Sequence, residues 1–112
     1  MTSTVIYKGA LRTEMQHLHS GSIIENDAPV DNHGKGERFS PTDMVCTALG
    51  SCMLTTMGIK AQSMNIDLVG TTVEITKIMK PEPRRIGGIK AYVHFAEVAM
   101  KQTKYLSKSI VF

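Results

Sequence analysis

Apolar residues are concentrated in one segment, residues 40–61 (SPTDMVCTALGSCMLTTMGIKA), which carries no charge from position 44 to position 59. Ser40 suits a helix N-cap, Pro41 the first helical position, and Asp43 the position from which a carboxylate reaches back to the cap. The apolar residues surround the helical wheel instead of forming one stripe, which is typical of a buried helix. We therefore predict a buried central helix over residues 40–64.

Before this helix, apolar and polar residues alternate in short runs, which predicts an N-terminal strand region over residues 1–39. The runs at 4–7, 11–17 and 22–25 are the predicted strands. Residues 26–36 (NDAPVDNHGKG) are dense in Asn, Asp, Pro and Gly and predict a loop. Eleven residues form a long connection, and long loops often carry function.

After the helix, residues 69–79 and 89–95 alternate in the same way on either side of Pro81-Glu82-Pro83. They predict an antiparallel hairpin over residues 68–95. Residues 96–112 are an atypical C-terminal segment, weakly helical at 101–109, whose apolar end we expect to pack on the core or on a partner. The expected fold is α+β, in one domain of residues 1–112 with antiparallel strands around the central helix.

Composition narrows the class of protein. The 112 residues include 42% hydrophobic residues, eight Met, no Trp and only 5% aromatic residues, which predicts one aliphatic, Met-rich core. The net charge of +3 is scattered, so we expect no nucleic-acid partner. The uncharged run of 44–59 falls short of the roughly 20 residues of a membrane-spanning helix, and no signal peptide is visible. We expect a soluble, cytoplasmic protein that has no membrane partner.

The two cysteines, Cys46 and Cys52, both lie on the predicted helix. Six helical residues advance about 9 Å and rotate the side chain about 240°. A disulfide needs Cα atoms within roughly 7 Å, so these two cysteines cannot pair while the helix is intact. They point to different sides of the helix and have to be interpreted separately.

For Cys46 we expect the role of a small core hydrophobe, which is usual for a free cysteine on an apolar helix. Cys52 has two interpretations, a structural one and a reactive one. The interior of a helix does not promote thiolate formation as a helix N-terminus does. A reactive Cys52 would therefore need a nearby cation, and the candidates are Arg12, Arg38, Arg84 and Arg85.

Other sites have weaker support. His17 and His19 have the spacing that puts two side chains on one side of a strand, but no carboxylate or thiol is tied to them locally. We expect solvated histidines at a turn and no metal. No glycine-rich phosphate loop and no serine nucleophile elbow are present, so we expect no cofactor.

The helix segment SPTDMVCTALGSC resembles the signature of the OsmC/Ohr family of thiol-dependent peroxidases. The matching features are Pro41, Asp43, the small-residue run 48–51 (ALGS) and Cys52. The flanking segments DAPVDNHGKGERFSP, IDLVGTTVEI and IKAYVHF are similar to the OsmC-like branch, so the resemblance covers residues 4–95. It implies an intertwined homodimer with active sites at the subunit interface and a cysteine helix packed on a curved sheet.

The resemblance also implies an activity, the reduction of organic hydroperoxides. Cys52 would be the reactive thiolate, with Asp43 as its acidic partner, one position later than in the Ohr branch. The family arginine comes from the N-terminal strands or loop; Arg38 is the first choice and Arg12 the second. Family members resolve the sulfenic acid with a later cysteine, whereas this sequence has no Cys after Cys52. We expect an external thiol as the reductant. The alternative is a non-catalytic dimeric domain of the same fold that binds a hydrophobic ligand.

Overall fold

The computed structural model describes residues 1–97. Two compact units are present, one formed by Met1–Met44 and one that begins at Val45. The elements follow in the order β1 (Ser3–Gly9), β2 (Arg12–His17), β3 (Ile23–Asp27), a short 3-10 helix (Val30–Asn32), α1 (Pro41–Ser63), β4 (Thr72–Lys80) and β5 (Arg85–His94). This content confirms the predicted α+β class with antiparallel strands. The C-terminal features predicted at 101–112 lie outside the described residues.

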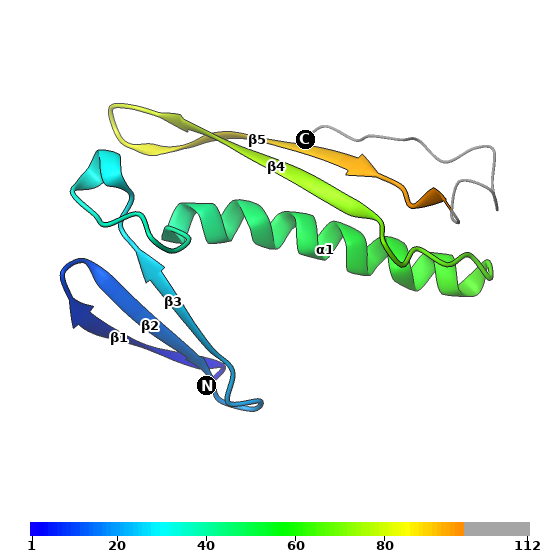
Figure 1. Cartoon of the computed structure of the whole chain (residues 1–112), viewed down its shortest axis with the longest axis horizontal. Coiled ribbons are helices and arrows are strands. Elements are labelled where there is room, and N and C mark those ends of the chain that lie inside the picture. The colour runs from blue at the N-terminus through cyan, green and yellow to red at the C-terminus, as the bar shows by residue number, and fades with distance from the viewer. Residues whose placement is uncertain (98–112) are drawn as a thin grey trace. The chain divides into compact units, whose positions relative to one another are not determined.

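The first unit contains a three-stranded antiparallel sheet in the order β1-β2-β3 (Figure 1). In its register Val5 lies opposite Met15, and Met15 lies opposite Ile24. Directly opposite residues share a face of an antiparallel sheet, so these three side chains form one apolar row across the sheet. Three N-terminal strands were predicted, and the sheet confirms them.

The predicted loop at 26–36 is partly wrong, because β3 runs on through Asp27 and residues 30–32 form a 3-10 turn. Asp27 is opposite Arg12 in the ladder, and its backbone N–H donates to the carbonyl of Phe39 at 3.1 Å. The N–H of Ala28 donates to the carbonyl of Leu11 at 3.0 Å. Asn and Asp have a low strand propensity, and for this reason the sequence pattern predicted a loop here. The hydrogen bonds to neighbouring segments outweigh that propensity.

The second unit contains the β4–β5 hairpin, which runs along α1 in Figure 1. Val73 pairs with Val93 and Ile75 with Ala91. Val93 and Ala91 are fully buried, which confirms the predicted inward face of the second strand. The first strand, predicted over residues 69–79, begins only at Thr72, and Val69 precedes it and is 82% exposed, so the predicted start of this strand is wrong.

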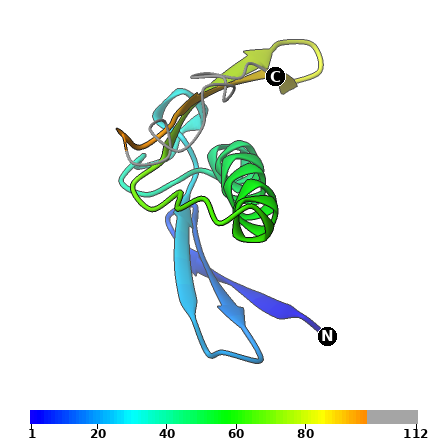
Figure 2. The same ribbon diagram turned by 90° about the vertical axis from the view of Figure 1, so that its right-hand side faces the viewer.

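Helix α1 touches β4 at Gly50, which is buried. A Cβ atom at this position would lie 3.0 Å from Ile75 Cδ1 and 3.2 Å from Ile75 Cγ1. The group that approaches Gly50 is thus the Ile75 side chain. Figure 2, in which α1 is seen nearly end-on, shows the hairpin on one side of the helix.

Both ends of α1 are closed by hydrogen bonds. Ser40 and Asp43 form a capping box, in which Asp43 N donates to Ser40 Oγ and Ser40 N donates to Asp43 Oδ2, both at 3.0 Å. At the other end Asn65 adopts a positive φ of 55°, and Ile66 N donates to the carbonyl of Ala61 at 2.9 Å. This is a Schellman motif, which ends the helix at a residue with positive φ.

The predicted central helix is present, but within the described chain it is only partly buried. Only Cys46, Gly50 and Ala61 are buried in α1, while Val45 is 57% and Ile59 72% exposed. A two-stranded hairpin covers only one side of a helix, whereas the apolar residues of α1 lie on all sides. The strands also form two separate sheets, of three and two strands, and not one curved sheet.

The 23 residues of α1 are long and apolar enough, by length and composition alone, to cross a membrane. The core helix of a soluble protein meets the same criterion. The contact of Gly50 with Ile75 is the packing of a helix on a sheet.

We predict that Gly50→Val lowers the free energy of unfolding by about 1–3 kcal/mol, because its side chain has to displace Ile75. Gly58→Val is the matched control on the same helix, since a Cβ there meets nothing within 4 Å. The control should stay within about 0.5 kcal/mol of wild type. Urea unfolding followed by circular dichroism measures both, and equal losses in the two variants would contradict this account of the helix contact.

Candidate functional site

The two cysteines have opposite surroundings. Cys46 is fully buried, with an exposed fraction of 0%, and Cys52 is exposed. Neither forms a disulfide within the described part of the chain, in agreement with the geometric argument. The predicted core role of Cys46 is confirmed. Cys52 is the thiol that a substrate in solution can reach.

Around Cys52 the nearest described polar partner is on its own helix. Its Sγ lies 4.0 Å from the hydroxyl oxygen of Thr56, one turn further along α1. The neighbouring Thr55 hydroxyl instead donates to the carbonyls of Ser51 and Cys52, each at 3.1 Å.

Asp43 lies in the first turn of α1 and is half-buried. One carboxylate oxygen accepts the backbone N–H of Ser40, so this side chain fixes the start of the cysteine helix. Its predicted role as the acidic partner of Cys52 stays a prediction, because Asp43 belongs to the first unit and Cys52 to the second.

Arg12 is held by a buried carboxylate. Its Nε donates to Asp27 Oδ1 at 2.6 Å and its Nη2 donates to Asp27 Oδ2 at 2.9 Å. The Asp27 side chain is 0% exposed and that of Arg12 is 21% exposed. A bidentate pair of this kind fixes the plane of the guanidinium as well as its position.

Arg38 is held more loosely, with a side chain that is 48% exposed. Its Nε lies 3.6 Å from Glu25 Oε1, and its Nη1 donates to the carbonyl of Glu37 at 3.1 Å. Of the two predicted arginines, Arg12 is therefore the better ordered, although the sequence ranked Arg38 first.

Glu37 connects the two arginines. Its carboxylate lies 3.6 Å from Arg12 Nη2, and its N–H donates to Asp27 Oδ2 at 3.2 Å. The first unit thus places Arg12, Arg38, Glu25, Asp27 and Glu37 in one charged cluster between β2, β3 and the segment before α1. Both arginines keep a defined position through these carboxylates, and both lie in a unit separate from Cys52.

The charges of this cluster shift two pKa values. The hydrogen bond from Arg12 lowers the pKa of Asp27 below its ordinary value of 3.8, and desolvation opposes it. The same hydrogen bond, with Asp27, raises the pKa of Arg12. The pair is therefore ionised throughout the neutral range.

The arginines of the second unit lie at the hairpin turn. Arg85 Nη1 donates to the carbonyls of Pro81 and Pro83, both at 3.0 Å. This guanidinium closes the turn between β4 and β5, and Arg84 is in the same turn.

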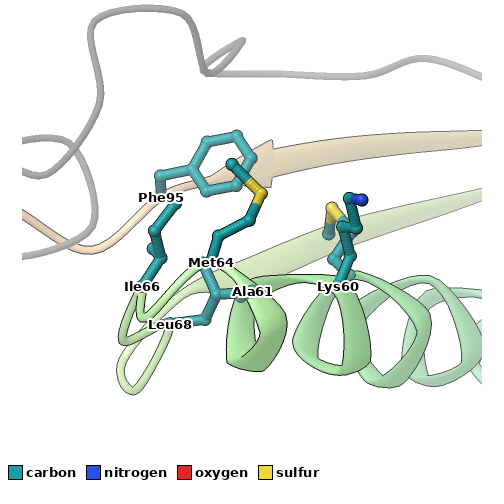
Figure 3. A pocket seen from close by; sticks show the side chains of 7 residues that line it. Lys60, Ala61, Met64, Ile66, Leu68 and Phe95 are labelled. Carbon is teal, nitrogen blue, oxygen red and sulfur yellow. The ribbon is translucent and has the colours of Figure 1, made fainter.

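The second unit also has an apolar pocket of about 120 Å³ beside the end of α1 (Figure 3). In this view the Met64 side chain extends toward Phe95, and Lys60 lies apart from both. The lining residues are Met57, Lys60, Ala61, Met64, Ile66, Leu68 and Phe95. Lys60 is the one charged residue among them, so the pocket combines an apolar wall with a single cation.

The histidine pair lies at the β2–β3 turn. The rings of His17 and His19 are 6.5 Å apart between centroids, and His17 Nδ1 lies 2.7 Å from Ser20 Oγ. Among residues 1–97 no group of three or more His, Cys, Asp or Glu side chains has the arrangement of a metal site.

Sequence reasoning missed four residues with a possible function: Asp27, Glu37, Thr56 and Lys60. The i, i+4 spacing of Cys52 and Thr56 on a predicted helix was a usable signal. The pairing of Asp27 with Arg12 spans 15 residues and depends on strand register, which the sequence did not show.

We predict a pH-dependent loss for Asp27→Asn. Because the folded-state pKa of Asp27 is lowered, the unfolded chain binds the proton more readily, and the carboxylate stabilises the fold above pH 3.8. This contribution disappears as the pH falls through the folded-state value. The variant should be less stable than wild type at pH 7, and the difference should narrow below about pH 4.

Urea unfolding at pH 7 and at pH 3 measures this difference. Glu82→Gln, at the exposed β4–β5 turn, is the matched control for removing a carboxylate charge. A difference between wild type and Asp27→Asn that is the same at both pH values would contradict the assigned role of the Arg12–Asp27 pair.

Comparison with known proteins shows which family this chain is related to. A family model described as OsmC-like protein matches residues 34–109. A crystal structure of a protein from Psychrobacter arcticus 273-4, described as an osmotic stress induced and detoxification response protein, is 52% identical in sequence with a TM-score of 0.85. That similarity covers 93% of this chain and 77% of the other. No curated protein matches the chain.

The family match covers more than half of the chain, includes the cysteine helix and agrees with the solved structure. The chain belongs to the OsmC-like family.

Proposed function

We propose that this protein reduces organic hydroperoxides through Cys52. The observation that carries the proposal is the exposed Cys52 thiol, on the helix that matches the OsmC-like family, beside a second thiol that is buried. The description of the Psychrobacter protein as a detoxification response protein supports the same general role.

The reaction begins at the Cys52 sulfur, which attacks one oxygen of the hydroperoxide as a thiolate. An S–O bond forms and the O–O bond breaks; the leaving alkoxide takes a proton and departs as an alcohol. Cys52 becomes a sulfenic acid, the first and reversible step of cysteine oxidation. An arginine and an acidic group would promote the thiolate, and Arg12, Arg38 and Asp43 are the residues proposed for these roles.

We propose that an external thiol completes the second half of the reaction. One thiol condenses with the sulfenic acid, releases water and forms a mixed disulfide, and a second thiol displaces the Cys52 thiolate from it. Cys46 cannot take the first role, because it is buried and lies six residues away on the same intact helix.

We propose a cytoplasmic homodimer with the active site at the interface. Support comes from apolar side chains that the single chain leaves exposed. On α1 these are Val45 and Ile59; on one face of the three-stranded sheet they are Val5, Tyr7 and Ile24. A second copy would bury such residues, as subunit interfaces commonly do.

A second candidate function is favoured by the pocket beside the end of α1. A non-catalytic domain of this fold would bind a hydrophobic ligand there, and Lys60 would pair with an anionic head group. A short aliphatic carboxylate fits this combination of an apolar wall and one cation.

For the first candidate, we predict that wild-type protein consumes cumene hydroperoxide in the presence of dithiothreitol and that Cys52→Ser abolishes the catalysed rate. The reason is that serine oxygen does not attack the peroxide bond under these conditions. Cys46→Ala is the matched control, since it removes the buried thiol, and should keep the wild-type rate. Equal rates for wild type and Cys52→Ser would rule out this function.

For the second candidate, we predict that octanoate shifts the ¹³C-methyl NMR signals of Met57 and Met64, which line the pocket, and not that of Met15. Lys60→Gln should weaken octanoate binding several-fold and leave octanol binding unchanged, because only the carboxylate pairs with the ammonium. Shifts that spread equally to Met15, or no shift at millimolar octanoate, would exclude this site.

A further inference from the structure

Two threonines follow each other on the exposed side of α1, and their hydroxyl groups have different partners. Thr55 Oγ1 donates to the backbone carbonyls of Ser51 and Cys52, the usual back-bonding of a threonine in a helix. Thr56 Oγ1 lies 4.0 Å from Cys52 Sγ. The two residues therefore have the same chemistry and similar exposure, but only Thr56 faces the sulfur.

The position of Thr56 follows from helix geometry. Residues four apart lie on the same face of a helix, so a hydroxyl at position 56 meets a side chain at position 52. A distance of 4.0 Å is at the outer limit for a hydrogen bond to the large sulfur atom. A neutral thiol accepts weakly, whereas a thiolate is a charged acceptor and forms a shorter, stronger bond.

We propose that Thr56 is a further catalytic residue, whose hydroxyl donates a hydrogen bond to the Cys52 thiolate. The proposal deepens the function proposed above, since it assigns a donor to the reacting sulfur. A hydrogen bond to the charged form favours that form, so the Thr56 hydroxyl stabilises the Cys52 thiolate relative to the thiol. The donor lies on the same helix as the sulfur and within the same unit, so this contact forms within one subunit and adds to the effect of an arginine.

The contact also orients the sulfur. A donor on the C-terminal side of Cys52 occupies one lone pair of the thiolate and leaves the others available to an incoming peroxide. Thr56 is exposed, so water competes for the same lone pair, and the expected effect is moderate.

The test measures the rate at which iodoacetamide alkylates Cys52, resolved from Cys46 by peptide mass spectrometry. At pH 7 the rate follows the thiolate fraction, and Thr56→Val should lower it about threefold. Cysteine thiols in general ionise at alkaline pH, so the rates of all variants should converge at pH 10. Thr56→Ser keeps the hydroxyl and should retain the wild-type rate at pH 7.

Thr55→Val is the matched control: it removes a neighbouring hydroxyl from the same exposed surface and should leave alkylation unchanged at both pH values. A loss in Thr56→Val that persists equally at pH 10, or an equal loss in Thr55→Val, would show a structural effect and overturn the proposal. So would a Thr56→Val rate at pH 7 equal to that of wild type.

The alkylation assay uses no peroxide, so its result does not depend on whether the protein is a peroxidase. If Thr56→Val slows alkylation only at pH 7 while the protein fails to consume cumene hydroperoxide, the role of Thr56 as a donor is supported and the peroxidase function is refuted. If the protein turns over peroxide and Thr56→Val is alkylated as fast as wild type, the peroxidase function is supported and the role of Thr56 is refuted.

Discussion

The contact between Gly50 and the side chain of Ile75 is the constraint on which the exposure of the two thiols depends. It fixes the side of α1 that packs on the β4–β5 hairpin, because any side chain at position 50 would meet Ile75 at about 3 Å. Once that side is fixed, helical geometry decides the surroundings of the two cysteines. Cys46 lies four residues before Gly50 and is buried; Cys52 lies two residues after it and points away from the hairpin side.

The charged cluster of the first unit also holds its side chains in a defined geometry. Asp27 has no exposed side-chain surface and binds Arg12 through two hydrogen bonds, so the cation is held in one orientation without a ligand. Glu37 and Glu25 hold Arg38 less tightly. An arginine that is already ordered loses little conformational freedom when it meets an anion, which is the property that thiolate activation and anion binding both need.

The sequence predicts local structure well where a few neighbouring residues decide it. The capping box of Ser40 and Asp43 and the alternation of apolar and polar residues in β5 could both be predicted from the spacing of residues. The extent of β3 could not, because Asp27 is fixed by Arg12, a partner on another strand. The exposure of α1 could not be predicted either. Apolar residues on all sides of a helix indicate that it packs against other elements, but they do not tell how many of these elements belong to the same chain.

For the candidate site, the sequence distinguished the two cysteines, but it did not identify which arginine would activate Cys52. Residue types near a cysteine in sequence do not give distances across strands, and Arg12 becomes the better-ordered candidate only through the register of β2 and β3. The resemblance to the OsmC/Ohr family singled out Cys52, and the family match together with the exposed position of that thiol supports the choice.

The central claim is that the packing of α1 directs peroxide chemistry to Cys52 and away from Cys46. Its most direct test is to add one equivalent of cumene hydroperoxide in the presence of dimedone, which traps sulfenic acids, and to map the adduct by peptide mass spectrometry. The account predicts a dimedone adduct on Cys52 and none on Cys46. An adduct on Cys46, or none on Cys52, would contradict it.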